Sequence, residues 1–495
     1  MIAMQKILQP QMLSFNKILV LPLILFFSLN IYAQDTNVLW ISIDDLNNWV
    51  GYLQGHPQVK TPNMDRLAAR GIAFTNAHCT TPLCKPSRTA ILTGQSETAN
   101  GVFRNGDDFN HSDFQLIPEY FAENNYITYG TGKIHHNSIN DEIFQHYYNT
   151  MQRWSPFSSS KQVEYSEEEL PSKGTDNPRH VIENGPGGKT YVLPFNRMSS
   201  ERSPGNPKGE SFDWASYDLP DTAFGDGRIT NWAIDQLKEH EDDHPFFMGV
   251  GYYRPHIPLY APKKYFDLYP IESIQLPEVI SNDLDDIPEA GRERALSAVT
   301  AGTHAHVVAN HQWKNAVQAY LACISFIDFQ IGKILDYLDN SPYANNTVIV
   351  LFSDHGWHLG EKQAWGKWSP WLQSTNTPFI ICPAGNTDGA LCYEPVSLLD
   401  IYPTLIDMLG LPEKTVSGVS LVPLFTNPAL STNRVVRTHV GRGTYALSNA
   451  EWRYIYYENG DEELYNIRKD PMEFDNLIEK KKYRSIIKDM KEKVR

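Results

Sequence analysis

The sequence lacks an excess of positive charge, because 43 Lys and Arg face 58 Asp and Glu over 495 residues and the formal net charge is -15. A chain of this charge does not attract polyanions over a distance, which argues against nucleic acid as a partner. An anionic substrate would have to be held by a local group of basic residues. Low-complexity tracts and internal repeats are also missing. A content of 41% hydrophobic and 12% aromatic residues therefore predicts a compact globular protein.

The N-terminus lacks an apolar run long enough for a comfortable membrane span. Lys6 and Lys17 come first, the apolar run covers residues 18–29, and the small residue Ala33 follows. This order predicts a secretory signal peptide at residues 1–33. The sequence thus predicts an exported protein, periplasmic or secreted, with no stable membrane insertion after cleavage. An uncleaved N-terminal anchor is the alternative.

Cysteine is sparse, with five residues in the chain. Cys382 and Cys392 bracket a short loop with proline and glycine, and in an oxidising compartment they could be either bridged or free. Cys323 lies in the apolar stretch 321–327 and is expected to be buried. Cys84 is different, because it opens the run Cys-Lys-Pro-Ser-Arg-Thr-Ala-Ile-Leu-Thr-Gly at residues 84–94.

Buried strands alternate with helices along most of the chain. Near-continuous apolar runs predict strands at residues 37–43, 126–130, 246–252, 347–353 and 379–382. Periodicity and capping residues predict helices at residues 63–70, 112–124, 313–338 and 397–409. This alternation predicts an α/β sandwich with a mostly parallel central sheet, in which ligands gather at the carboxyl ends of the strands.

The pattern changes after about residue 425. Strand-like pieces at residues 435–440 and 453–457 precede a lysine-rich tail. We therefore expect a catalytic domain at residues 34–425 and a smaller α+β subdomain at residues 426–495. The Pro-, Gly- and Ser-rich stretch 155–220 has little periodicity, and we expect an insertion packed near the site or a loop.

Acidic residues follow two of the predicted strands. Asp44 and Asp45 come directly after strand 37–43, and Asp354 and His355 come directly after strand 347–353. Adjacent carboxylates at a strand end repel each other by several kcal/mol at an effective dielectric constant of about 20, so they need a counter-charge. Oxygen-rich ligand sets favour Ca²⁺ or Mg²⁺ over Zn²⁺. Either pair alone could be a helix cap or a solvated turn, but together they indicate a metal site.

The run that begins at Cys84 resembles the signature of the type I sulfatases. In that family a maturation enzyme reads Cys-x-Pro-x-Arg, here Cys84, Pro86 and Arg88, and oxidises the cysteine to formylglycine. The resemblance implies an alkaline-phosphatase-like fold. It also implies that one hydroxyl of the hydrated aldehyde attacks sulfur, and that deprotonation of the second hydroxyl expels sulfate. A serine could take the sulfuryl group, but its ester would be as hard to hydrolyse as the substrate.

The same resemblance assigns the metal ligands. It implies that Asp44, Asp45, Asp354 and His355 hold Ca²⁺ together with the formylglycine oxygen at position 84, with Mg²⁺ the less favoured ion. In the family the last of these positions is usually Asn or His, and this chain has His.

Basic residues would complete a sulfate pocket. Gly132-Lys133-Ile134-His135-His136 resembles the Gly-Lys-x-His element of the family, and either histidine could be the catalytic one. The iduronate-2-sulfatase-like branch favours His136. Pro255-His-Ile-Pro258 resembles the same branch and supplies His256, and Lys367 matches the other basic residue of the family pocket.

These residues have roles that the resemblance implies. Arg88, Lys133, His256 and Lys367 would supply the local positive charge and stabilise charge on the sulfate oxygens. His256 or Lys367 would protonate the departing sugar oxygen, and His136 or His135 would serve the elimination step.

The resemblance covers nearly the whole mature chain, and bacterial relatives of this branch cleave sulfate from diverse polysaccharides. A marine algal polymer such as ulvan and a glycosaminoglycan are both candidate substrates. Residues 104–108, 155–220 and 304–311 are expected to line the leaving-group side. Two alternatives stay open: a formylglycine-dependent phosphomonoesterase or phosphodiesterase, and a catalytically silent carbohydrate-binding protein in which Cys84 is not converted.

Overall fold

The computed structural model describes residues 36–136, 139–149, 180–184, 190–194, 196, 198, 212–241, 243–298 and 302–493. The chain from Tyr32 to Arg495 forms one compact unit. The predicted signal peptide and most of the stretch 155–220 lie outside the described residues. Within the part that is described, the structure contains no helix with both the length and the apolar character needed to cross a bilayer.

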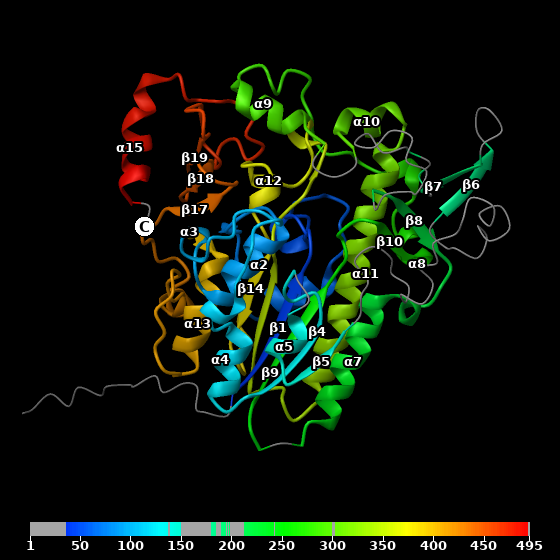
Figure 1. Cartoon of the computed structure of the whole chain (residues 1–495), viewed down its shortest axis with the longest axis vertical. Helices are drawn as coiled ribbons and strands as arrows, with labels where there is room; N and C mark the ends of the chain where they lie inside the picture. The colour runs from blue at the N-terminus through cyan, green and yellow to red at the C-terminus, as the bar shows by residue number, and fades with distance from the viewer. Residues whose placement is uncertain are drawn as a thin grey trace, which may run out of the picture. The chain divides into compact units, whose positions relative to one another are not determined.

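An eight-stranded sheet forms the centre of this unit among the described residues, in the order β15-β2-β14-β11-β1-β9-β4-β5 (Figure 1). The strands are β1 (Asn37–Ile43), β2 (Ile72–Phe74), β4 (Ile127–Gly132), β5 (His146–Tyr148), β9 (Phe246–Tyr252), β11 (Thr347–Ser353), β14 (Phe379–Cys382) and β15 (Ala390–Cys392). β14 pairs antiparallel with β11 and β2, and the other pairs are parallel. The predicted mostly parallel sheet is confirmed.

Both faces of the sheet are buried, which explains the continuous apolar runs of its central strands. Successive residues of β1 point to opposite faces, so Leu39 and Ile41 enter one core while Val38 and Trp40 enter the other. The first core includes α1 (Pro62–Ala68), α7 (Gly225–Glu239) and α11 (Trp313–Asp339). The second includes α2 (Cys84–Thr93), α4 (Ile117–Glu123) and α13 (Ile401–Met408). Figure 1 shows α7 and α11 on one side of the sheet and α2, α4 and α13 on the other.

The helix predicted at residues 112–124 is shorter in the structure, where α4 begins only at Ile117. Pro118 lies in its first turn, the place where a missing backbone N–H costs least. Glu119 closes this end, because its Oε2 accepts a hydrogen bond of 2.8 Å from the Leu116 backbone N–H. The proline and the cap together set the first residue of the helix.

The C-terminal part is an antiparallel sheet of β17 (Val436–His439), β18 (Tyr445–Ser448), β19 (Arg453–Tyr456) and β20 (Glu462–Tyr465). Met490 of α15 (Arg484–Lys493) is buried with Leu447, Tyr454 and Leu464 of this sheet. Figure 1 shows α15 beside β17, β18 and β19. The α+β character of this part is confirmed, whereas the boundary at residue 425 stays a prediction.

Cys382 and Cys392 are both free. They lie on β14 and β15, and β2 runs between these two strands in the sheet. Because neighbouring strands are about 4.8 Å apart, two strands separated by a third are too far apart for a disulfide. The structure therefore excludes a disulfide between Cys382 and Cys392. Cys323 is buried in α11, as expected.

Candidate active site

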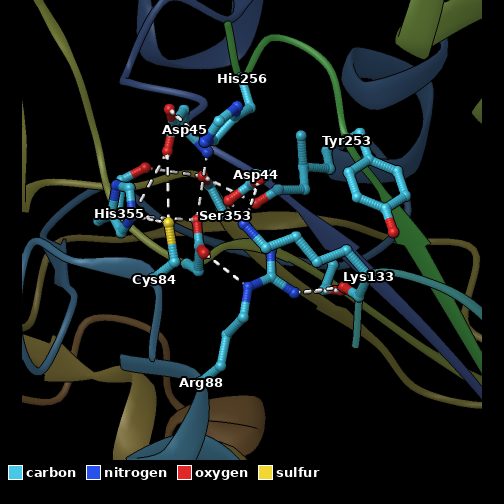
Figure 2. A network of polar contacts seen from close by, with 12 residues as sticks. Asp44, Asp45, Cys84, Arg88, Lys133, Tyr253, His256, Ser353 and His355 are labelled. Atoms are coloured by element: carbon cyan, nitrogen blue, oxygen red, sulfur yellow. Dashed lines mark hydrogen bonds and ion pairs between the residues drawn. The ribbon is translucent and has the colours of Figure 1, made fainter. Parts of the chain in front are cut away.

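The predicted site residues gather at one edge of the central sheet (Figure 2). Asp44 and Asp45 follow β1, Lys133 follows β4, His256 lies in the loop after β9, and Asp354 follows β11. These four strands are parallel, so their carboxyl ends meet at the same edge. The topology therefore brings together segments that lie more than 300 residues apart in the sequence.

Cys84 is the first residue of α2 and is fully buried. Its Sγ lies 2.9 Å from Lys367 Nζ, 3.4 Å from His355 Nε2 and 4.0 Å from Asp45 Oδ1. Burial opposes ionisation of the thiol, but Lys133, Lys367 and His355 outweigh it and hold the pKa of Cys84 well below its ordinary value. A helix N-terminus also favours negative charge. The surroundings of residue 84 therefore stabilise a negative charge on its side chain.

Three carboxylates surround this position, and the side chains of Asp44, Asp45 and Asp354 are fully buried. The ligand atoms of Asp44, Cys84, Asp354 and His355 all lie within 4.8 Å of one another, and the same is true of Asp44, Asp45, Cys84 and His256. Asp44 Oδ1 and Asp45 Oδ2 are buried without a hydrogen-bond donor. Burying a carboxylate oxygen without a hydrogen-bond donor destabilises the folded protein unless a cation binds to that oxygen. The donor set therefore fits a metal ion.

Arg88 connects α2 to the ends of three strands. It lies one helical turn after Cys84, on the same face of α2. Its Nε donates to Asp354 Oδ2 at 2.7 Å, its Nη2 is 3.5 Å from Asp44 Oδ1, and its Nη1 donates to the backbone carbonyl of Lys133. Figure 2 shows the guanidinium group between the carboxylates and the Lys133 segment. Arg88 therefore orients two acidic residues as well as carrying charge.

Lys133 reaches the site because β4 and β9 approach closely at their ends. Gly132 has a φ of +72°, and a Cβ there would lie 2.0 Å from the Gly251 carbonyl oxygen. The turn lets the Lys133 Nζ donate to Asp44 Oδ2. Burial would raise the pKa of Asp44, but Lys133, His256 and Arg88 hold it well below its ordinary value. Asp44 is therefore an anion at neutral pH.

The structure distinguishes the two adjacent histidines. The His135 ring is buried, with its Nε2 3.2 Å from Thr89 Oγ1, and its backbone N–H donates to Asn140 Oδ1 at 2.6 Å. Burial and the neighbouring His136 lower the pKa of His135 to about 3. His136 instead forms a side-chain hydrogen bond that lowers the Cys84 pKa. His136 is thus the histidine that the structure brings to Cys84.

His256 and Lys367 lie on either side of Asp45. His256 Nε2 is 3.9 Å from Asp45 Oδ2, and Lys367 Nζ is 2.7 Å from Asp45 Oδ1. Burial lowers the pKa of Lys367, but Asp45 and Cys84 raise it more, so the pKa of this amine lies above its ordinary value. All of the predicted site residues except His135 therefore meet around position 84.

Several buried side chains that the sequence did not reveal hold this site in place. Tyr320 of α11 donates to the Asp45 carbonyl oxygen at 2.6 Å, and Ser87 of α2 donates to the Asp354 carbonyl oxygen at 2.6 Å. Asp45 has a φ of 64°, a strained conformation for a residue with a side chain. Tyr320 lies among apolar residues of a long helix, so its sequence pattern indicates only a core residue.

Asp226 of α7 positions the loop that carries His256. Its Oδ1 accepts a hydrogen bond of 2.7 Å from the Tyr253 backbone N–H. Burial raises the pKa of Asp226 to about 6, although Arg254 acts in the opposite direction. Two glycines flank Asp226 in the sequence, and we did not predict a helix there.

Two of the segments predicted to line the leaving-group side are described. Arg104 and Asp108 are exposed, and the ring of His304 packs against Trp313 at 4.5 Å and Trp365 at 6.1 Å. Burial lowers the pKa of His304 to about 4. The roles of these segments stay predictions, and most of the third segment, 155–220, lies outside the described residues.

Comparison with known proteins decides the family, because the sequence model named Sulfatase matches residues 36–411. The chain belongs to the sulfatase family. It is therefore a sulfuric ester hydrolase. A second model, N-sulphoglucosamine sulphohydrolase, C-terminal, matches residues 360–495.

Relatives of this sulfatase cover most of its length. A sulfatase from Formosa agariphila is 36% identical over 465 residues, which cover 92% of this chain and 85% of that protein. Iduronate 2-sulfatase from Homo sapiens is 30% identical over 419 residues, which cover 76% of this chain and 69% of that protein. An ulvan-active sulfatase from Formosa agariphila is 25% identical over 476 residues, which cover 92% of this chain and 80% of that protein.

Solved structures share the fold. A protein in complex with its substrate D-glucosamine-2-N,6-O-disulfate matches with a TM-score of 0.68 at 20% identity, over 92% of this chain and 96% of that chain. The phosphonate monoester hydrolase of Agrobacterium radiobacter matches with a TM-score of 0.67 at 20% identity, over 92% and 94%. At this level of identity the likeness concerns the fold alone, and the predicted alkaline-phosphatase-like architecture is confirmed.

Proposed function

We propose that this sulfatase removes sulfate from a sulfated polysaccharide or its oligosaccharides through a formylglycine made from Cys84. The observation that carries the proposal is the position of Cys84 Sγ, 2.9 Å from Lys367 Nζ and 3.4 Å from His355 Nε2, beside three buried carboxylates. The names of relatives support the substrate class, since they include an ulvan-active sulfatase and iduronate 2-sulfatase. A marine algal polymer and a glycosaminoglycan are the two candidate substrates.

Ca²⁺ is the ion that we propose for the site. Asp44, Asp45 and Asp354 supply carboxylate oxygens and His355 a ring nitrogen, and Ca²⁺ prefers sites rich in oxygen. Asp44 Oδ1 lies 3.5 Å from Arg88 Nη2 and Asp45 Oδ2 lies 3.9 Å from His256 Nε2, but neither oxygen accepts a hydrogen bond from the described residues, so both can bind the cation. Mg²⁺ is less favoured because it demands near-ideal octahedral geometry and keeps several waters.

The residues around position 84 have separate tasks in this proposal. The formylglycine supplies a hydroxyl that takes the sulfuryl group, and the cation supplies electrostatic polarisation. Arg88, Lys133 and Lys367 donate to sulfate oxygens as charge builds on them. His256 Nε2 or Lys367 Nζ gives a proton to the departing sugar oxygen, and the His136 ring takes a proton from the group at position 84.

Two measurements test the proposal. Intact mass of the exported protein should be lower than that of the unmodified chain by one sulfur-for-oxygen exchange and two hydrogens. Sulfate release should then be measured on a panel of sulfated oligosaccharides, with Cys84→Ala as the inactive control. Unmodified Cys84 in protein from the native host, or sulfate release by Cys84→Ala, would contradict the formylglycine mechanism.

Phosphoester hydrolysis is the alternative activity. We favour sulfate because Lys133, His256 and Lys367 add three basic groups around the site. Paired rates on nitrophenyl sulfate and nitrophenyl phosphate distinguish the two activities, and a higher kcat/KM on the phosphate ester would reverse the preference.

Export to the periplasm or the medium belongs to the same proposal. It rests on the charged, apolar and small-residue order of residues 1–33. N-terminal sequencing of protein recovered outside the cytoplasm should begin at Gln34, and a mature chain that still begins at Met1 would indicate an uncleaved anchor. A maturation enzyme that converts Cys84 is the partner that this proposal requires.

A further inference from the structure

Two arginines lie against the residue that follows Lys367. The Cζ atoms of Arg104 and Arg294 are 6.0 Å and 5.7 Å from the centre of the Trp368 ring, within reach of a cation–π contact. Arg104 belongs to the loop after α3 (Glu97–Asn100), and Arg294 belongs to α9 (Glu289–Leu296). Arg294 Nη1 also donates to the Trp368 carbonyl oxygen at 3.0 Å. Two distant segments thus place guanidinium groups around one indole.

Neither arginine forms an ion pair with an acidic residue in the described part of the chain. Across the ranges that the structure describes, no carboxylate oxygen lies within 4.0 Å of either guanidinium group. Asp107 of the same loop accepts hydrogen bonds from the backbone N–H groups of Phe103 and Arg104 and lies 3.7 Å from Arg442 Nη2. Its charge is therefore already engaged.

Arg294 is more buried than Arg104. Its Nε is buried and has no hydrogen-bond acceptor among the described residues. Burial lowers the pKa of Arg294, and the neighbouring Arg104 lowers it further. A buried donor beside a like charge is costly, and an anion bound between the two guanidinium groups would remove that cost.

Backbone hydrogen bonds connect Trp368 and the Arg104 loop to residues that neighbour Cys84 in the sequence. Trp368 donates its backbone N–H to the Pro82 carbonyl oxygen at 3.2 Å, two residues before Cys84. The Arg104 loop is attached to Lys85, whose backbone N–H donates to Asn105 Oδ1 at 3.0 Å. Lys367 is buried, Trp368 is half-buried and Arg104 is exposed. Exposure therefore increases from Lys367 beside position 84 to Arg104 at the surface.

We propose that Arg104 and Arg294 bind a second anionic group, a carboxylate or another sulfate, on the saccharide whose sulfate ester is cleaved. Planar guanidinium groups bind such groups through paired hydrogen bonds, and Trp368 orients both of them. The inference rests on the proposed function, and it narrows the substrate class to saccharides that carry at least two negative charges near each other.

A binding experiment tests this inference without depending on turnover. The full chain with Cys84→Ala is titrated calorimetrically with three disaccharides that share one sulfate ester: one with no other charged group, one that also has a uronate carboxylate, and one that also has a second sulfate. We expect at least one of the doubly charged ligands to bind ten times or more tighter than the singly charged one. Which ligand it is distinguishes the two sources of charge.

Variants then locate the effect. Arg104→Gln and Arg294→Gln, each in the Cys84→Ala chain, should each lose most of that tenfold preference while binding the singly charged ligand similarly. Arg66→Gln is the matched control, because Arg66 pairs with Asp336 and lies on α1, on the other face of the sheet from α2. It should retain the preference, and melting temperatures should show that all variants are folded.

Two outcomes would overturn the inference: equal affinity for all three ligands, or a preference that survives in both arginine variants. A parallel assay of sulfate release with converted Cys84 checks the proposed function by itself. Absence of release from every ligand would remove the proposed function, but the affinities would still decide whether Arg104 and Arg294 bind a second anion.

Discussion

Lys367 Nζ lies 2.9 Å from Cys84 Sγ and 2.7 Å from Asp45 Oδ1. Lys367 follows the short hairpin of β12 (His358–Leu359) and β13 (Trp365–Gly366), whereas Cys84 begins a helix 283 residues earlier. This single amine therefore connects Cys84 to the carboxylate cluster. Its surroundings make it a fixed positive charge, because Asp45 and Cys84 keep its pKa above the ordinary value.

Replacement of Lys367 should affect catalysis far more than folding. We expect Lys367→Met to reduce kcat on a sulfated substrate by about 100-fold or more, since it removes a donor aimed at the developing charge. Steady-state kinetics and the melting temperature should be measured together. A loss of activity that is matched by global unfolding would show a structural role instead.

Substitutions of the two adjacent histidines should differ in their effects on kcat and on stability. His136→Ala should lower kcat by about 100-fold or more with a small change in stability, because a general acid or base typically contributes this much. His135→Ala should lower the free energy of unfolding by roughly 1–3 kcal/mol through the loss of buried contacts, and should retain most activity. Kinetics and denaturant titrations of both variants check this, and the reverse pattern would assign the catalytic role to His135.

Calcium should stabilise the folded protein through the three buried carboxylates. Treatment with a chelator should lower the melting temperature and abolish sulfate release, and added Ca²⁺ should restore both. Asp44→Asn, which weakens the ligand set, should make the melting temperature insensitive to Ca²⁺ up to concentrations that saturate the unaltered protein. Equal stabilisation of Asp44→Asn and the unaltered chain would place the ion elsewhere.

Glu361 gives the stability a defined pH dependence. Burial raises its folded pKa to about 7, against hydrogen bonds that lower it, while its ordinary value is 4.5. The folded state therefore binds more protons than the unfolded state between these values, and stability falls as pH rises through this range.

We expect Glu361→Gln to reduce the loss of stability between pH 5 and pH 8 by on the order of 1–3 kcal/mol. Denaturant titrations at several pH values measure it, with Glu458→Gln as the exposed control. If Glu361→Gln leaves the pH dependence of the free energy of unfolding unchanged, the extra proton of the folded state is not bound by Glu361.

Arg453 connects the C-terminal sheet to the segment that follows Lys367. Its Nε donates to the Pro370 carbonyl oxygen at 2.9 Å and its Nη2 to Thr375 Oγ1 at 2.7 Å, and Glu473 lies 3.4 Å from Nε. All of these groups are buried. Arg453→Ala should therefore destabilise the protein by about 3–5 kcal/mol, because it removes one partner of a buried ion pair together with the donors to Pro370 and Thr375.

The exposed Arg468 supplies the control for this measurement, and Arg468→Ala should change the free energy of unfolding by less than about 0.5 kcal/mol. Thermal or denaturant unfolding compares the two variants. Similar, small effects of both substitutions would mean that Arg453 does not hold the C-terminal sheet to the rest of the chain.

Four strands of the central sheet could be predicted from the sequence to the residue, whereas β4, predicted at residues 126–130, covers Ile127–Gly132. The bounds of β1, β9, β11 and β14 match the predicted runs because these strands are buried on both faces and read as continuous apolar segments. The antiparallel direction of β14 could not be predicted, since an apolar run carries no information about direction. The acidic and basic residues were recognised from local motifs at strand ends.

The supporting residues were missed because their contacts are not local. Tyr320 and Asp226 lie on helices and act on loops at the sheet edge 275 and 27 residues away, respectively. Nothing in the pattern of those helices marks such side chains. The choice between His135 and His136 likewise depended on which ring the turn after Gly132 directs toward Cys84.

Helix α2 has a consequence for how the mature protein is made. Cys84, Pro86 and Arg88 are buried in it, with Cys84 at 0% and Arg88 at 2% exposure, and the Arg88 side chain contacts the ends of three strands. A modifying enzyme cannot bind these three side chains once α2 has packed against the sheet. If Cys84 is converted as proposed, the conversion has to precede docking, while the segment is still unfolded, and a molecule that folds first would keep the thiol.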